Sequence, residues 1–518
     1  MTSPETPPLD PARVPLDHGA GRIPAQRAAP AAAAPRPGRS PWLVLAVLSA
    51  AQLMVVLDAT VVNIALPSAQ SALGFSDANR QWVVTAYALA FGSLLLLGGR
   101  LSDVIGRKPL FVTGVVGFAL ASALGGAAQG FGTLVAARAL QGVFGAMLAP
   151  AALSLLTTTF TDPAARTKAF GIFGAVAGAG GGFGLLLGGL LTEHLSWRWC
   201  LYVNDVIAVV VLVAAVVLLE HKRSDDRAPL DWFGTVLAVV GLVGIVYGLG
   251  NAETHGWSAA GTWGFLVAGV VLMAVFVWWQ ARAAHPLLPL RVVLDRNRGG
   301  SLLAMAVVGA GMFGVFLFLT YYLSAQLGYT PVRTGLAFLP MIGAISVTAP
   351  VVGSRLLTRV GPKPLIPTGL VLAAVGMALL TRIDVDSSYA SVVLPGLVVE
   401  GVGLGFIFSA AMASAVQGVD RADAGVAGAM ANTVQQIGGS IGTALLSALA
   451  GSAATRYAQD HAAQMATAAG KAQAVVASYH AAFWVCAAIF LVGALVTALV
   501  LRRGAPEVDP DAAPVIAH

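Results

Sequence analysis

Four ionisable side chains stand inside long apolar stretches of the sequence: Asp58, Arg138, Asp205 and Glu400. An ionised group in an apolar environment is costly unless it meets water, an opposite charge or, for a carboxylate, a proton. A carboxyl group in such a place can bind either a proton or a cation, because the two compete for the same oxygens. These residue types therefore suggest an exchange of protons for cationic ligands.

Each of these residues also has a structural interpretation, which the sequence leaves open. Asp58 could hydrogen-bond a neighbouring helix, and Glu400 could pair with an arginine. Arg138 lies one helical turn from Gln141 on the same face and could form a structural ion pair. Asp205 lies closer to the end of its apolar stretch and could simply meet water. We expect Asp58 to face a watery cavity, since it stands ~22 Å into its helix at 1.5 Å per residue.

The composition places these residues in a membrane. Hydrophobic residues make up 57% of the 518 residues and charged residues only 10%, with a mean hydropathy of +0.80. Soluble proteins carry ~25% charged residues, so a water-facing body of this size is excluded, as are coiled coils and disordered chains. The net charge of +6 fits basic loops against anionic lipid better than a nucleic-acid partner. Two distant cysteines signal neither a disulfide framework nor a zinc site.

Fourteen apolar segments are long enough to cross a bilayer, which takes roughly 20 helical residues. Pro67 and the charged stretch 103–108 are among the predicted breaks between them. The loop charges support an even number of crossings without fixing it. The predicted segments are 42–66, 81–99, 109–129, 133–157, 168–191, 199–219, 231–250, 260–280, 300–320, 334–353, 364–381, 390–416, 424–450 and 478–501.

The basic residues predict the orientation. With the proline-rich segment 1–41 inside the cell, about 23 of the 30 Lys and Arg fall on the cytoplasmic side and about 6 outside, as the positive-inside rule requires. We therefore expect a multi-pass protein of the cell membrane with both termini cytoplasmic. Residues 1–41 and 502–518 would be tails, the first of them disordered.

Two loops share a phrase, which predicts an internal repeat. Residues 98–110 read GGRLSDVIGRKPL and residues 353–365 read GSRLLTRVGPKPL. Chance similarity of short basic loops is the alternative. Because both loops fall on the same predicted side, the two halves would run parallel, as in one known transporter architecture. We expect a six-helix bundle over 42–220, an inserted two-helix hairpin with its linkers over 221–299, and a second bundle over 300–501.

At this point the sequence resembles a known family. Gly99, Leu101, Asp103, Gly106, Arg107 and Lys108 match the cytoplasmic loop signature of the major facilitator superfamily. The stretch LDATVVNIALP at 57–67 resembles the first-helix phrase of its fourteen-helix drug:proton antiporters. The stretches RALQG at 138–142 and SWRW at 196–199, with Asn204, continue the resemblance over about residues 42–501. Leu185, where the family usually has proline, Asp205 and Glu400 depart from it.

The resemblance implies an all-α membrane protein of the major facilitator fold, with two six-helix bundles and two inserted helices. It implies a cytoplasmic gate loop formed by Gly99, Asp103, Gly106, Arg107 and Lys108. The alternative is that Arg107 and Lys108 only follow the positive-inside rule, which would not explain Asp103. The resemblance also implies that Arg138 assists proton transfer. Glycines at a spacing of four in the fifth helix should permit close helix packing, with a flexible hinge as the second reading. We expect this role for Gly174, Gly178, Gly182, Gly184, Gly188 and Gly189.

We therefore expect a secondary transporter that exports lipophilic, cationic drugs or antibiotics in exchange for protons. Proton coupling would use Asp58, Glu400, Arg138 and Asp205. Aromatic and methionine side chains are typical of broad drug pockets, so we expect a cavity lined by Asp58, Tyr87, Phe91, Gln141, Phe313, Tyr321, Glu400 and Met412. A proton-coupled importer or an exporter of another solute would use the same fold, and only the direction of flux separates them.

No nucleotide-binding motif occurs in the sequence, so we expect the proton gradient to drive transport, with no cofactor or metal. The expected partners are a drug-like small molecule, protons and lipid, without nucleic acid, and the chain is expected to be a monomer. A membrane enzyme would need clustered catalytic groups, whereas the polar residues here are few and scattered. A channel would need a filter-like segment, and the sequence has none.

Overall fold

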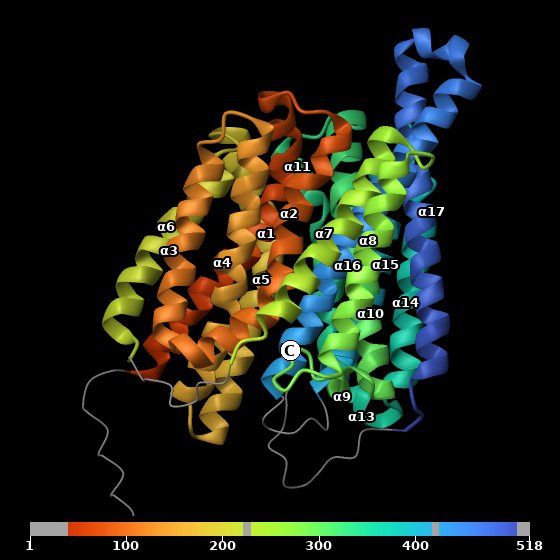
Figure 1. Ribbon diagram of the computed structural model, residues 1–518. Coiled ribbons are helices and arrows are strands. Elements are labelled where there is room, and N and C mark those ends of the chain that lie inside the picture. The colour runs from red at the N-terminus through yellow and green to blue at the C-terminus, as the bar shows by residue number, and fades with distance from the viewer. Residues whose placement is uncertain (1–39, 221–228, 417–423, 505–518) are drawn as a thin grey trace, which may run out of the picture. The chain divides into compact units, whose positions relative to one another are not determined.

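A computed structural model of the chain describes residues 40–220, 229–416 and 424–504, and within these ranges the chain is helical with no strand (Figure 1). Nearly all of the two predicted tails lies outside the described residues. Six helices come first: α1 (Pro41–Leu73), α2 (Asp77–Ile105), α3 (Arg107–Gly126), α4 (Phe131–Thr159), α5 (Pro163–His194) and α6 (Trp199–Leu218). Proline in the first turn starts α1 and α5, because its missing N–H would be unsatisfied there in any case.

A hairpin of two further helices follows, α7 (Trp232–His255) and α8 (Ala260–Gln280), and then the short α9 (Leu290–Val293). The side chain of Asp231 caps α7 by accepting from the Gly234 N–H at 2.8 Å. The Nε1–H of Trp279 and the Nε2 amide of Gln280 also donate to this carboxylate, which fixes α8 beside α7.

The remaining helices form the second half. They are α10 (Arg296–Tyr321), η1 (Tyr322–Gln326), α11 (Pro331–Ala337), α12 (Leu339–Val351), η2 (Val352–Leu356), α13 (Leu357–Val360), α14 (Pro362–Leu380), η3 (Tyr389–Val393), α15 (Leu394–Val416), α16 (Ala424–Asp460), η4 (Ala462–Ala466) and α17 (Ala468–Val500).

Among the described residues, fourteen helical segments are long and apolar enough to span a bilayer, which confirms the predicted fold class. One predicted break is wrong, because α1 continues through Pro67 to Leu73. Proline removes one helical hydrogen bond, and this loss is tolerated in a packed membrane helix. The predicted last helix begins ten residues too late, since the alanine-rich segment before residue 478 favours helix and extends α17 back to Ala468.

The two halves repeat one packing pattern. In the first half, α1 contacts α4, α5 and α6, while α3 contacts α4 and α6. In the second half, α10 contacts α15, α16 and α17, while α14 contacts α15 and α17. The same order of neighbours is what a parallel repeat of six helices produces.

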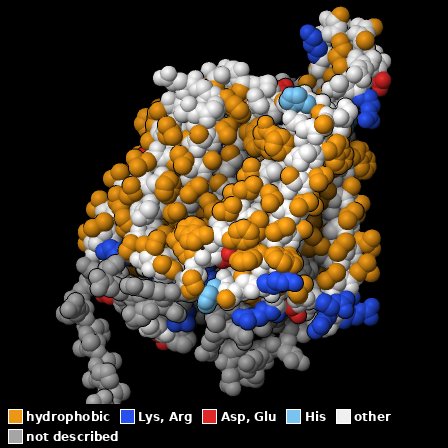
Figure 2. All heavy atoms as spheres, viewed as in Figure 1, with side chains coloured by type: hydrophobic (Ala, Val, Ile, Leu, Met, Phe, Trp, Pro, Cys, Tyr) orange, Lys and Arg blue, Asp and Glu red, His pale blue; other side chains and the backbone are white. Residues whose placement is uncertain are grey.

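The outer surface suits lipid. Val206, Val209, Val210 and Val213 form an exposed stripe along α6 at helical spacing. Figure 2 shows hydrophobic side chains over the sides of the helices and Lys and Arg gathered along the lower rim, near α9 and α13. We call this rim the α2–α3 end and the opposite one the α1–α2 end, after the loops that lie there.

The inserted hairpin covers a seam between the halves. Helix α2 of the first half packs along α16 of the second, and α7 contacts both. Leu89 of α2, Leu242, Val246 and Leu249 of α7, and Ala444 of α16 form one buried apolar cluster. The hairpin is therefore attached to both halves along this seam.

Candidate functional site

The polar centre of the first half is built around the Asp58 carboxylate of α1. Arg138 Nη1 of α4 donates to Asp58 Oδ2 at 2.5 Å, which makes a buried ion pair. Gln141 Nε2 donates to Asp58 Oδ1 at 2.7 Å, and Asn204 Nδ2 of α6 donates to the same oxygen at 2.8 Å. Gln141 Nε2 also reaches Ser122 Oγ of α3 at 2.7 Å. The hydrogen-bonded cluster around this carboxylate thus ties together α1, α3, α4 and α6.

Arg138 has its own set of contacts. It donates from Nη1 to Gln141 Oε1 at 2.8 Å and from Nε to the Val83 carbonyl of α2 at 3.1 Å. Its guanidinium carbon lies 4.5 Å from the centroid of the Tyr87 ring, a cation–π distance. The short spacing from α4 to α2 depends on Gly142, where a Cβ would collide with the Tyr87 carbonyl.

This site is sealed from water in the present conformation. Asp58 and Arg138 are each 1% exposed, and Gln141 and Asn204 are fully buried. The expectation that Asp58 faces a watery cavity is therefore not met in this structure. A buried guanidinium needs a counter-charge, and Asp58 supplies it inside the first half.

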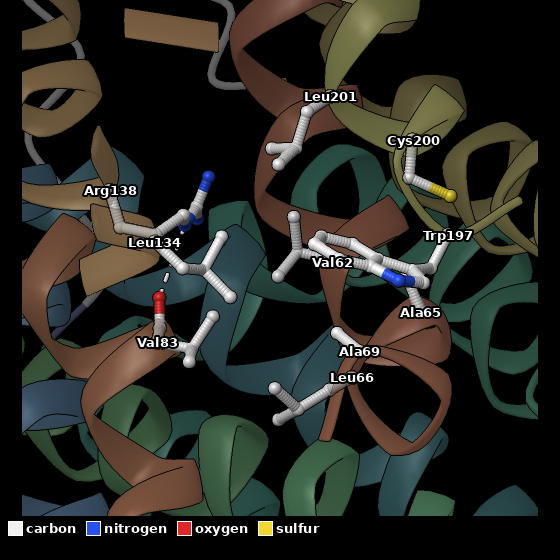
Figure 3. A pocket seen from close by; sticks show the side chains of 10 residues that line it. All are labelled: Val62, Ala65, Leu66, Ala69, Val83, Leu134, Arg138, Trp197, Cys200 and Leu201. Carbon is white, nitrogen blue, oxygen red and sulfur yellow. Dashed lines mark hydrogen bonds between the residues drawn. The ribbon is translucent and has the colours of Figure 1, made fainter. Parts of the chain in front are cut away.

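An apolar pocket adjoins the ion pair towards the α1–α2 end. Its cavity volume is only about 10 Å³, and successive turns of α1 line one wall with Val62, Ala65, Leu66 and Ala69. Figure 3 shows Arg138 at its edge beside Leu134, with the Trp197 and Cys200 side chains across the pocket. Arg138 is the charged member of a lining whose other side chains are mostly apolar, and its Nε donates to the carbonyl of Val83, which also lines the pocket.

Asp205 does not join this site. Its neighbour Asn204 points to Asp58, while Asp205 is half-buried and shares no hydrogen bond with the cluster among the described residues. Successive residues of a helix face different directions, so one of two adjacent polar residues had to point elsewhere. Asn204 and Ser122 were missed as site residues. Asn204 stood in the sequence motif, whereas a lone serine among small residues gave no signal.

Glu400 of α15 lies in the core of the second half. It is fully buried, and neither carboxyl oxygen has a hydrogen-bond partner among the described residues. The Cys486 thiol of α17 is close enough to interact with it electrostatically. In α4, Arg138 precedes Gln141 by three residues, but in α15 the residue three before Glu400 is the buried Leu397. The second half therefore repeats the position of the polar residue without the cation.

The predicted gate loop binds its own half. Gly106 has a φ of 100° and turns the chain sharply from α2 into α3. Lys108 Nζ donates to the carbonyls of Val216 at 2.9 Å and Leu219 at 2.6 Å, which satisfies the last turn of α6. A Cβ added at Gly99 would lie 4.0 Å from the Pro150 side chain, so Gly99 is not required for close packing there. Arg107 is half-buried. The side chain of Asp103 lies outside the described residues.

The glycines of α5 divide between two neighbours. Gly184 and Gly188 lie against Thr60 and Val61 of α1, whereas Gly182 and Gly189 lie against the second half, at Ile342 and Val332. Gly174 is half-buried. The packing expected at Gly178 is not found, because a Cβ there would have no neighbour within 4 Å.

The predicted cavity residues fall into separate places: Asp58, Tyr87, Phe91 and Gln141 lie together in the first half, and the other four lie elsewhere. Tyr87 and Phe91 stack at 5.8 Å and are buried beside α4, where Gly142 and Gly145 leave room for them. Phe313 of α10 lies against Gly439 of α16, and Met412 is half-buried on α15. Tyr321 is buried and hydrogen-bonded to Gln70 of α1. The eight residues do not line one shared cavity in this conformation, because the aromatic residues of α2 pack against α4 rather than towards the other half.

Comparison with known proteins agrees with this architecture. The sequence profile of the Major Facilitator Superfamily matches residues 48–443. The chain is 51% identical over 422 residues to the puromycin resistance protein pur8 of Streptomyces alboniger, covering 81% of this chain and 84% of that protein. It is 39% identical to the cephamycin export protein CmcT of Amycolatopsis lactamdurans, with 78% and 83% covered. It is 34% identical to the multidrug efflux pump LfrA of Mycolicibacterium smegmatis, with 78% and 80% covered.

Solved structures share the fold at low sequence identity. The peptide-family transporter PepTSo superposes with a TM-score of 0.65 at 15% identity, covering 89% of this chain and 98% of that chain. A bacterial homologue of the lysosomal transporter Spinster gives 0.62 at 16%, covering 89% and 98%. Together with the profile match and the repeated six-helix packing, these similarities mean that the chain belongs to the Major Facilitator Superfamily.

Proposed function

We propose that this protein is a proton-driven exporter of lipophilic, drug-like compounds, and not an enzyme. The observation that carries the proposal is the 51% identity to a puromycin resistance protein over 81% of the chain. The relatives named for cephamycin export and multidrug efflux support the same direction of transport. Lipophilic cations, including aminonucleoside antibiotics, are the proposed substrate class.

The proposed orientation places the α2–α3 end in the cytoplasm, with both chain termini on that side of the cell membrane. Arg107, Lys108, Arg296 and Arg359 lie at this end, as do most basic residues of the described chain. The positive-inside rule supports this assignment. The α1–α2 end then faces outward.

The proposed coupling uses two buried carboxyl groups in different states. Asp58 is ionised here, since it receives hydrogen bonds from Arg138, Gln141 and Asn204. Glu400 carries a proton here, because an ionised carboxylate with no partner in an apolar core would be far less stable. When the halves change position, water reaches Asp58, a proton from outside neutralises it, and Arg138 is released.

The export is tested with the purified protein in liposomes. In liposomes that hold the protein in inside-out orientation, an imposed pH gradient should drive accumulation of puromycin or the lipophilic cation ethidium. Collapsing the gradient should stop this accumulation. Equal export without a pH gradient would show that transport is not coupled to protons. Gradient-driven movement in the opposite direction would instead make the protein an importer.

A further inference from the structure

The first turn of α2 reaches across the boundary between the two halves. Arg80 belongs to the first half, and its side chain is only 13% exposed. Its guanidinium carbon lies 4.2 Å from the Tyr321 ring centroid and 5.8 Å from the Phe318 ring centroid, both on α10 of the second half. A guanidinium held over a ring at the first of these distances makes a cation–π contact.

Polar contacts close this arrangement into a ring. The Tyr321 hydroxyl donates to Gln70 Oε1 of α1 at 2.5 Å, and Gln70 Nε2 donates to Asp77 Oδ1 at 2.7 Å. Asp77 Oδ1 lies 3.9 Å from Arg80 Nη1. We call Gln70, Asp77, Arg80 and Tyr321 the Arg80 latch. Three members come from the first half and one from the second, so the latch breaks when the halves separate here.

The inserted hairpin holds the base of the latch. Gln81, next to Arg80, donates from Nε2 to Glu253 Oε2 of α7 at 2.8 Å, and Gln81 is 1% exposed. The Glu253 side chain also lies against Gly451 of α16, where a Cβ would meet its Cγ at 3.2 Å. Two carboxyl groups lie near the Arg80 guanidinium, those of Asp77 on α2 and Glu253 on α7.

The latch lies where the α1–α2 end meets water. A groove of about 740 Å³ opens there, lined by Gln70, Asp77, Tyr321 and Ser324 among others. A second tie lies elsewhere on the same boundary, where the Val332 N–H of α11 donates to Glu193 Oε2 of α5 at 2.9 Å. Arg80 thus fastens the α1–α2 side of this boundary, and the bond between Glu193 and Val332 fastens the α5 side.

We propose that Arg80 is a positioning residue of the transport cycle, which holds the halves together at the α1–α2 end until substrate is released there. The position of this step in the cycle rests on the proposed export function. The closure itself does not, because it follows from contacts between the halves and can be measured without transport.

The test uses a cysteine placed behind the latch. Asn63 lies two helical turns from Gln70 on the same face of α1 and is 7% exposed. In the Asn63→Cys background, a membrane-impermeant maleimide added outside intact cells should label slowly. Arg80→Ala should raise the labelling rate about tenfold, the change expected when a desolvated cation–π contact is lost. The same variants without the Asn63→Cys substitution measure the background labelling of Cys200 and Cys486, which are buried.

The control variant is Arg333→Ala. Arg333 lies 3.9 Å from the Tyr329 ring centroid at the same end, but both residues belong to the second half. Its loss should leave labelling unchanged. Tyr321→Phe keeps the ring and loses only the bond to Gln70, so a smaller increase is expected from a variant that perturbs packing little. Labelling of Arg80→Ala and Tyr321→Phe at the rate of Arg333→Ala would overturn the proposal. If Arg80→Ala labels faster but the wild-type protein does not export, the proposed function is rejected and the latch proposal is retained.

Discussion

At the residue scale, the cation of the first half and the lone carboxyl of the second are the features that matter most. Arg138 was expected from the sequence to need a buried acceptor, and Asp58 is that acceptor. The sequence could not show this pairing, because the residues are separated by 80 positions and their side-chain directions depend on how α1 and α4 pack. Ser122 completes the site without any sequence signal, since its polarity matters only where four helices meet.

Removing Arg138 should be costly. Arg138→Ala leaves Asp58 as an uncompensated buried charge, so the unfolding free energy should fall by about 3–5 kcal/mol. Thermal unfolding of the purified protein in detergent measures this loss. Arg282→Ala, which removes an exposed guanidinium over the Trp278 ring, should change stability little. Equal stability of the two variants would contradict the ion pair as a structural necessity.

Replacing Glu400 should change proton coupling but not stability. Glu400→Gln substitutes a neutral group of nearly the same shape for a carboxyl that we propose to be neutral already. Its stability should match the wild type within about 1 kcal/mol, while the number of protons exchanged per substrate falls. Calorimetry and proton counting in liposomes measure the two effects. A large loss of stability would show instead that Glu400 is ionised and paired.

At the element scale, the existence and order of the helices were predictable, because runs of about 20 apolar residues can cross a bilayer only as helices or closed barrels. Helix ends were less predictable. Pro67 is accommodated inside α1, and alanine-rich sequence extends α16 and α17 beyond the apolar runs. Which glycine touches which helix could not be predicted either, since Gly178 and Gly182 share a spacing but only Gly182 has a neighbour.

The glycines therefore differ in their tolerance of a methyl group. Gly142→Ala places a Cβ against the Tyr87 backbone carbonyl, so α4 must move from α2, and a loss of roughly 1–3 kcal/mol is expected. Gly178→Ala meets open space and should be neutral or slightly stabilising, because alanine favours helix. Unfolding curves of the two variants provide the comparison. A destabilisation at Gly178 equal to that at Gly142 would contradict the packing described here.

At the scale of the whole molecule, the protein consists of two similar bundles whose polar centres are not equivalent. In the part of the chain that the structure describes, the first half holds a carboxylate paired with a cation, and the second holds a carboxyl without one. The hairpin of α7 and α8 contacts both α2 and α16, so it should restrict how the halves slide along that seam. The sequence predicted the parallel repeat, but the attachment of the hairpin became visible only from the packing.

The central claim is that the Asp58 carboxyl exchanges its proton with the outside as the halves change position. The most direct measurement is substrate-induced proton movement in liposomes containing Asp58→Asn, with Asp205→Asn as the matched control on α6. We expect proton movement to fall at least about tenfold for Asp58→Asn, as for loss of a group that carries the transferred proton, and to persist for Asp205→Asn. Undiminished proton movement with Asp58→Asn, or its loss only with Asp205→Asn, would contradict the account.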